Sequence, residues 1–159
     1  ELDDLIDEHD DLLEEYGDFL KLSLPITKKL DVDFDLPMLD LKVLAGILTY
    51  SDLMITQYST LLIESSIFDL PAINNGLGKY RDFGDKASSY EVATHIKSIK
   101  KYNAFSSVYS IKELDHSINN YLLNPELNAD GRKMLVEDLV SKNKGNAGSS
   151  IGKFITQVV

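Results

Sequence analysis

The segment 52–76 constrains the fold more than any other part of this 159-residue chain. Residues 53–56 form a short apolar run without alternation, which is typical of a strand covered on both faces. Residues 59–68 then follow a helical pattern that a proline ends, and residues 72–75 read as a second short strand. Strand–helix–strand units with such tight connections are parallel in nearly all cases, so the segment predicts a doubly wound sheet.

Hydrophobic spacing extends the alternation of helices and strands in both directions. We expect further helices over residues 1–16, 37–50, 90–102, 110–123, 129–142 and 149–159, strands over 19–24 and 107–109, and irregular chain over 25–36 and 77–89. Helix 37–50 is expected to bury a face made of Leu39, Val43, Leu44, Ile47 and Leu48. The fold class predicted from this order is α/β and Rossmann-like, a mostly parallel sheet flanked by helices.

A capping box is predicted at the start of helix 110–123. Ser110 stands three residues before Glu113, the spacing at which the hydroxyl and the carboxylate satisfy each other's backbone N–H groups. We interpret the whole chain, 1–159, as a single domain with an acidic helix and loop at 1–36, a core at 37–143 and a closing helix at 144–159. Because it begins without Met inside a helical pattern, we expect a domain truncated at its N-terminus.

Charge and composition exclude several classes of function. The net charge of −10 divides into −11 over residues 1–40 and +1 over residues 41–159. With no basic stripe, sequence-independent binding to nucleic acid or to an anionic membrane surface is not expected. The absence of Cys excludes a disulfide framework, a thiolate zinc site and a Cys nucleophile. Without a long apolar run or a signal peptide, we expect a cytoplasmic protein.

A phosphate site is predicted where the helix at 59–68 follows its strand. Ligands of open parallel sheets bind outside the carboxyl ends of the strands, where helix N-termini present free N–H groups. Ser59 and Thr60 would place two hydroxyls there, and Glu64, about one turn further, would accept hydrogen bonds from vicinal hydroxyls such as those of ribose. The plainer interpretation is an N-cap followed by a solvated Glu. Tyr58 would either stack on a base or pack into the core.

Resemblance to a known family favours the functional interpretation. The string from Ser51 to Thr60, with Glu64 and the Pro-Ala-Ile that begins at Pro71, resembles the donor-binding half of GT-B-type glycosyltransferases. It is closest to the branch that includes CDP-glycerol glycerophosphotransferases and surface-polysaccharide enzymes. Further similarity over about residues 36–155 lies in Thr94-His95 with Lys97, helix 110–123, Asn124-Pro-Glu, Gly131-Arg132 and 145–151.

The resemblance implies roles for particular residues. Ser59 and Thr60 would hold the diphosphate of the donor, Glu64 its ribose, and His95 a phosphate or the transferring group. The donor would be a nucleoside-diphosphate sugar or CDP-glycerol, with no cofactor and no metal. The acceptor-binding half and the family's His-Pro turn would precede Glu1. Any peripheral association with the inner face of the membrane would come through that missing half, and this chain alone is expected to be inactive.

The remaining polar patterns are interpreted as structural. The run from Asp31 to Asp35 fails as a calcium loop, because its sixth position is Leu36 and its twelfth is Lys42. His9 and His116 are expected to be exposed and inert. Lys79 and Arg81 could reach a diphosphate, but solvation is the favoured interpretation. Two alternative functions remain open: a UDP-N-acetylglucosamine 2-epimerase-like enzyme with the same cradle, and a non-catalytic binding or assembly module that retains the fold.

Overall fold

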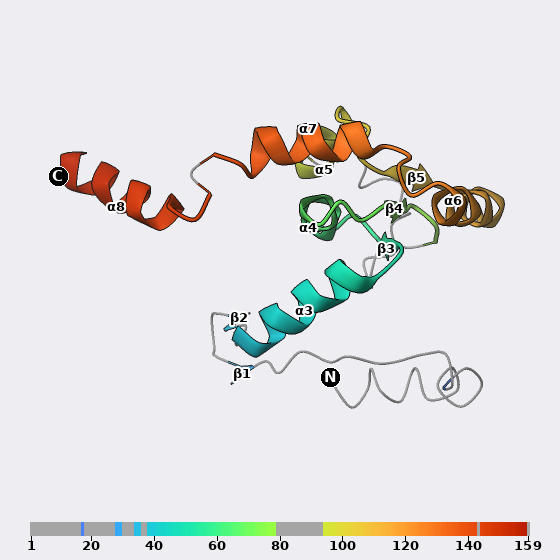
Figure 1. Cartoon of the computed structure of the whole chain (residues 1–159), viewed down its shortest axis with the longest axis horizontal. Coiled ribbons are helices and arrows are strands. Elements are labelled where there is room, and N and C mark those ends of the chain that lie inside the picture. The colour runs from blue at the N-terminus through green and yellow to red at the C-terminus, as the bar shows by residue number, and fades with distance from the viewer. Residues whose placement is uncertain are drawn as a thin grey trace. The chain divides into compact units, whose positions relative to one another are not determined.

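A computed structural model describes residues 17, 28–29, 34–35, 38–78, 94–142 and 144–158 of the chain (Figure 1). The chain divides into two units, Glu1–Val43 and Leu44–Val159, and each is described by itself. The elements in chain order are β1 (Lys28–Lys29), β2 (Phe34–Asp35), α3 (Met38–Tyr50), β3 (Met54–Thr56), α4 (Leu61–Ile67), β4 (Ala72–Asn75), α5 (Thr94–Lys100), β5 (Ser106–Val108), α6 (Ile111–Leu123), α7 (Ala129–Leu139) and α8 (Ala147–Val158).

The first unit contains a small antiparallel pair. β1 pairs with β2 so that Lys28 lies opposite Asp35 and Lys29 opposite Phe34. The expectation of irregular chain over 25–36 is therefore wrong at these positions, because strands of two residues are too short to show an alternating pattern. The helix expected at 1–16 and the strand expected at 19–24 lie outside the described residues.

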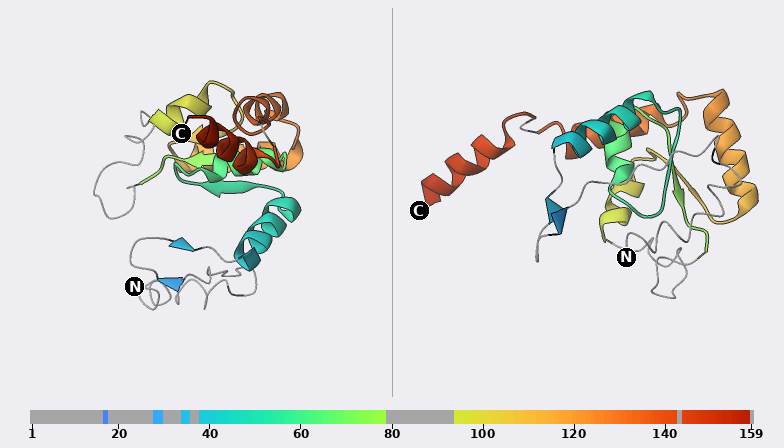
Figure 2. Two further views of the ribbon diagram at one scale, coloured as in Figure 1. Left: turned by 90° about the vertical axis from the view of Figure 1, so that its left-hand side faces the viewer. Right: turned by 90° about the horizontal axis from the view of Figure 1, so that it is seen from below.

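The second unit is built on a three-stranded parallel sheet in the order β3-β4-β5. Both pairs of strands are parallel, and in their register Met54 lies opposite Ala72 and Ile73 opposite Ser106. Helices α4, α5 and α7 lie on one side of this sheet and α6 on the other (Figures 1 and 2). The prediction of an α/β, Rossmann-like architecture with a parallel sheet between helices is confirmed.

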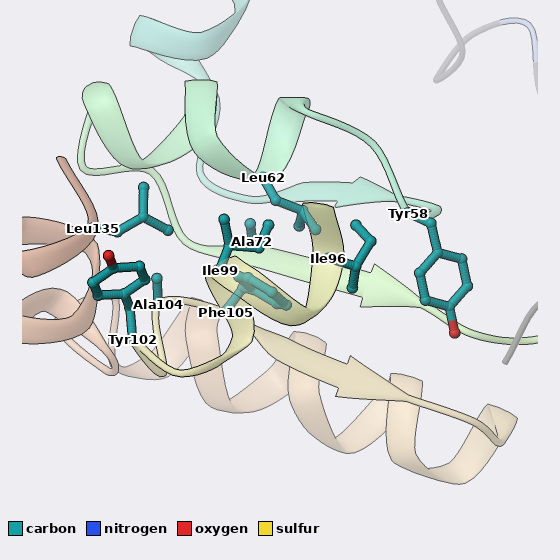
Figure 3. Close-up of a cluster of buried hydrophobic side chains, with 9 residues drawn as sticks. All are labelled: Tyr58, Leu62, Ala72, Ile96, Ile99, Tyr102, Ala104, Phe105 and Leu135. Carbon is teal, nitrogen blue, oxygen red and sulfur yellow. The ribbon is translucent and has the colours of Figure 1, made fainter. Parts of the chain in front are cut away.

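Two hydrophobic clusters fill the space between sheet and helices. The larger one joins β4 to α4, α5 and α7 and comprises Tyr58, Leu62, Ala72, Ile96, Ile99, Tyr102, Ala104, Phe105 and Leu135 (Figure 3). The smaller one, against α6, comprises Ile73, Val108 and Tyr121. In β4, Ala72 belongs to the first cluster and Ile73 to the second, so helices cover both faces of this strand.

Helix α3 buries less than the sequence predicted. Leu48 is buried, but Leu39, Val43 and Ile47 are 58%, 42% and 43% exposed. The expectation of a continuous buried face is therefore wrong: of the five residues, Leu48 is buried and Leu44 is half-buried, and the other three are exposed. Hydrophobic periodicity identified the helix correctly, but it does not show how much of a helix a core covers.

The predicted cap of α6 forms with one change of partner. Ser110 Oγ accepts a hydrogen bond from the Glu113 backbone N–H at 3.3 Å, as expected. Glu113 Oε2 accepts from the backbone N–H of Tyr109 at 2.7 Å, where the capping box predicted the N–H of Ser110. The carboxylate thus reaches one residue further back and also fixes the end of β5.

A polar network ties α6, α7 and the α5–β5 turn together. The Tyr121 hydroxyl donates to Asn128 Oδ1 at 2.8 Å and lies 3.1 Å from Ser106 Oγ. Asn128 Nδ2 donates in turn to the Asn103 carbonyl at 2.9 Å. Burial raises the pKa of the Tyr121 hydroxyl above its ordinary value, against the opposing effects of the Ser106 hydrogen bond and the Arg132 charge.

Candidate functional site

The loops that follow the three parallel strands meet at one edge of the sheet. β3 is followed by residues 57–60, β4 by 76–78 and β5 by 109–110. Because the strands are parallel and in register, their carboxyl ends lie at the same edge. This is the edge at which open α/β sheets bind their ligands. Ser59 and Thr60, predicted from the sequence, lie in the first of these loops.

The backbone of Tyr58 is held in an unusual conformation. Its φ angle is 48°, in the left-handed region that residues other than glycine rarely enter, at a cost of order 1–3 kcal/mol. Its N–H donates to Oδ1 of the fully buried Asn74 at 2.9 Å. Asn74 Nδ2 donates to Ser107 Oγ at 3.4 Å. One buried amide in β4 therefore connects the loop after β3 with β5, and it fixes the residue that precedes Ser59.

Replacing Asn74 by alanine is expected to lower the free energy of unfolding by about 1–3 kcal/mol, because it leaves the Tyr58 N–H without its acceptor. Urea denaturation followed by circular dichroism measures the loss. Ser107→Ala is the matched control, since it removes only the long 3.4 Å bond and should cost less than Asn74→Ala. Equal losses in the two variants would contradict a role for Asn74 in fixing Tyr58.

The side chain of Tyr58 packs into the larger cluster. It is 3% exposed and lies at the edge of that cluster, beyond Ile96 (Figure 3). A Cβ placed on Gly76 would come within 2.8 Å of both the Tyr58 hydroxyl oxygen and Tyr109 Cδ1. Glycine at 76 thus leaves room for both rings. Of the two roles that the sequence left open for Tyr58, stacking on a base or packing in the core, the structure shows packing.

Ser59, Thr60 and Glu64 lie together on one short stretch. Ser59 Oγ accepts from the Leu61 N–H at 3.2 Å, and Thr60 Oγ1 donates to Glu64 Oε1 at 3.5 Å. Thr60 is exposed, and Ser59 and Glu64 are half-buried. Helix α4 begins at Leu61, two residues later than predicted, and its first N–H is already bound by Ser59. A ligand here would therefore meet side-chain hydroxyls more readily than helix N–H groups.

Two residues that the sequence analysis did not single out fasten this edge. Gln57 Nε2 donates to the Leu77 carbonyl at 3.0 Å, and Asn75 Oδ1 accepts from the Leu77 N–H at 3.0 Å. The Gln57 bond therefore joins the loops after β3 and β4, and the Asn75 bond closes a turn at the end of β4. The sequence did offer a pattern that could have identified these residues, namely an amide side chain at the end of a predicted strand. Gln57 directly follows the strand predicted at 53–56, and Asn74 and Asn75 end the strand predicted at 72–75.

A cavity of about 460 Å³ lies along β5, between α5 and α6. Its charged and aromatic lining comprises Lys100, Tyr109, Glu113 and His116, and the residues of the β3–α4 loop are not among its lining residues. Lys100 Nζ donates to the Tyr109 hydroxyl at 3.4 Å. His116 is exposed, as predicted, with its ring 2.9 Å from the Asn120 amide nitrogen. This polar groove is distinct from the predicted site.

Other sequence candidates lie partly or wholly outside the described residues. His95 belongs to the first turn of α5, but its side chain is not described, and neither are Lys79, Arg81 and His9. Of the acidic run 31–35, only β2 is described. Among the residues that the structure describes, no three His, Asp or Glu side chains lie close enough to hold a metal ion. Ser59, Thr60 and Glu64 are thus the predicted site residues that the structure brings together.

The fold and this edge define a Rossmann-like α/β domain. No protein-family model, no curated protein and no solved structure matches the chain significantly. Within the described parts, none of the helices has both the length and the apolar composition needed to cross a bilayer.

Proposed function

We propose that the chain binds a nucleotide-activated donor and is the donor-binding half of a GT-B-type transferase, acting in cell-surface glycan or polymer synthesis. The observation that carries this proposal is the fixed left-handed conformation of Tyr58, held by the buried Asn74. Strained backbone of this kind concentrates at ligand sites, and here it directly precedes Ser59 and Thr60 at the carboxyl edge of a parallel sheet.

The chemistry of the site residues suits a nucleoside diphosphate. A hydroxyl that accepts one N–H, as Ser59 does from Leu61, keeps its own hydrogen to donate to a phosphate oxygen. Thr60 offers a second, exposed hydroxyl, which would exchange its long 3.5 Å hydrogen bond to Glu64 Oε1 for one to the phosphate. Glu64 lies next to Thr60 and offers carboxylate oxygens to the two hydroxyls of a ribose. Residues 41–159 carry a net charge of +1, so the body of the chain does not repel an anionic ligand.

The proposed reaction is transfer of the activated group to an acceptor bound by a second half of the enzyme. Donors aimed at the departing phosphate stabilise the charge that develops on it. Ser59 and Thr60 would supply such donors, and the resemblance adds His95 as a group that contacts a phosphate or the transferring group. No metal is required in this scheme.

Calorimetric titration of the chain with CDP and with UDP tests the proposal. We expect one of them to bind, and we expect the double variant Ser59→Ala, Thr60→Ala to weaken that binding at least tenfold, or about 1.4 kcal/mol. Ser117→Ala is the matched control because it removes a hydroxyl from the cavity beside β5 and should leave the affinity unchanged. The proposal fails if neither nucleotide binds, or if Ser117→Ala weakens binding and the double variant does not.

A further inference from the structure

The only Asn-Gly pair in the sequence, Asn75-Gly76, stands at the end of β4. Asn-Gly is the pair most prone to deamidation, because glycine has no Cβ to hinder the attack of its backbone nitrogen on the preceding side-chain amide. Packing requires glycine here, since a Cβ on residue 76 would lie 2.8 Å from both the Tyr58 hydroxyl oxygen and Tyr109 Cδ1. The fold therefore places a chemically labile pair at the carboxyl edge of the sheet.

The side chain of Asn75 is oriented for this reaction. Its Oδ1 accepts a hydrogen bond from the Leu77 N–H at 3.0 Å, and the ring that this bond closes includes the Gly76 nitrogen. The same bond draws electron density from Cγ, the carbon that the nitrogen has to attack. Two requirements of the reaction are thus met, an amide folded back along the chain and a polarised carbonyl.

The backbone N–H of Gly76, in contrast, is bound elsewhere. It donates to the Val108 carbonyl at 2.8 Å, next to the position where Asn75 pairs with Val108 in the ladder between β4 and β5. Attack requires this nitrogen to lose its proton and the peptide to turn out of the extended conformation of a strand. The ladder bond blocks both, and the burial of Gly76 shields its N–H from the base that would remove the proton.

We propose that Asn75 is a deamidation site that the β4–β5 ladder keeps closed, and that it reacts only when the end of this ladder opens. In the open state the Gly76 nitrogen forms a bond to Asn75 Cγ and gives its proton to solvent, and the side-chain nitrogen leaves as ammonia. Water then opens the cyclic imide at either carbonyl, which yields aspartate or isoaspartate. The proposal is independent of the nucleotide site.

The products make the opening permanent. Isoaspartate inserts an extra carbon into the backbone before the Gly76 nitrogen, so Gly76 loses its register with Val108. Either product also adds a negative charge at the edge of the sheet where Ser59 and Thr60 lie. Because the reaction is irreversible, the deamidated fraction of the protein records how long this edge has been open.

Peptide mass spectrometry of the full chain, kept in mildly alkaline buffer, measures the rate of deamidation at Asn75. In native buffer this rate should be lower than in unfolding urea by about tenfold or more, because only the open fraction reacts. Hydrogen exchange of the Gly76 amide, followed by NMR, measures the same opening independently, and the two protection factors should agree. Deamidation as fast in native buffer as in urea, or much faster than the exchange of Gly76 allows, would overturn the proposal.

Two core variants show whether the opening is local. Val108→Ala loosens the residue whose carbonyl binds Gly76, whereas Leu135→Ala removes a larger buried side chain from the cluster under α7 and should cost more global stability. In native buffer we expect Val108→Ala to speed deamidation about fivefold or more, and to speed it more than Leu135→Ala does. The opposite order would show that the reaction proceeds through global unfolding and would overturn the proposal.

Discussion

Replacing Arg132 by alanine is expected to lower the free energy of unfolding by about 3–5 kcal/mol. The guanidinium is 1% exposed, and its Nη1 and Nη2 donate to the carbonyls of Leu127 at 2.7 Å and Pro125 at 3.0 Å. Its Nε donates to Asp69 Oδ1 at 2.7 Å. The variant loses a charged donor to two carbonyls of the α6–α7 turn and leaves a cavity under α7. Chemical denaturation with urea measures the difference.

Asp69→Asn is the matched control for Arg132→Ala. The Asp69 side chain is 66% exposed, so its ion pair with Arg132 is partly solvated and should contribute about 1 kcal/mol or less. Asn also tolerates the left-handed backbone of this position, where φ is 54°. A loss in Asp69→Asn as large as that in Arg132→Ala would show that the ion pair, and not the carbonyl contacts, dominates the stabilisation.

Substitution of Gly131 by alanine is expected to cost about 3 kcal/mol. A Cβ at this position would lie 2.3 Å from the Asn103 carbonyl oxygen and 2.4 Å from the Tyr102 carbonyl oxygen. Both are backbone atoms of the turn before β5, so α7 has to move away from the sheet. The melting temperature of the variant should fall by several degrees in a thermal scan.

Gly46→Ala is the matched control for Gly131→Ala. Gly46 also lies inside a helix, but a Cβ there meets no atom of the described residues within 4 Å. Alanine should therefore be neutral or stabilise the helix by up to about 1 kcal/mol. Equal losses of stability in Gly131→Ala and Gly46→Ala would contradict this prediction, because the close approach at Gly131 would then not be the cause.

Hydrophobic spacing was sufficient to predict the helices and strands that short stretches of sequence mark directly. β3, β4 and α6 appear within about two residues of their predicted bounds, because apolar runs and the Ser110 cap mark them directly. The β1–β2 pair and the exposed face of α3 were missed. Strands of two residues are too short to show an alternating pattern, and periodicity does not encode how much of a helix face a core covers.

The candidate site was predictable in position but not in detail. Ser59 and Thr60 do lie at the carboxyl edge of a parallel strand, since strand–helix–strand connectivity determines that edge. The contact of Asn74 with Tyr58 joins residues 16 positions apart, so no local sequence pattern predicts it. Gly131 and Arg132, noted for their resemblance to a family, have packing roles that only the structure reveals.

Backbone amide resonances of the labelled chain test the central claim most directly. On titration with CDP or UDP, the amides of residues 57–64 should shift with one common dissociation constant, and the Tyr58 amide should shift among them because its N–H lies within the loop. Amides along β5 and in the cavity beside it should remain in place. Shifts confined to the β5 cavity, or none at all at saturating nucleotide, would contradict a nucleotide site at Ser59 and Thr60.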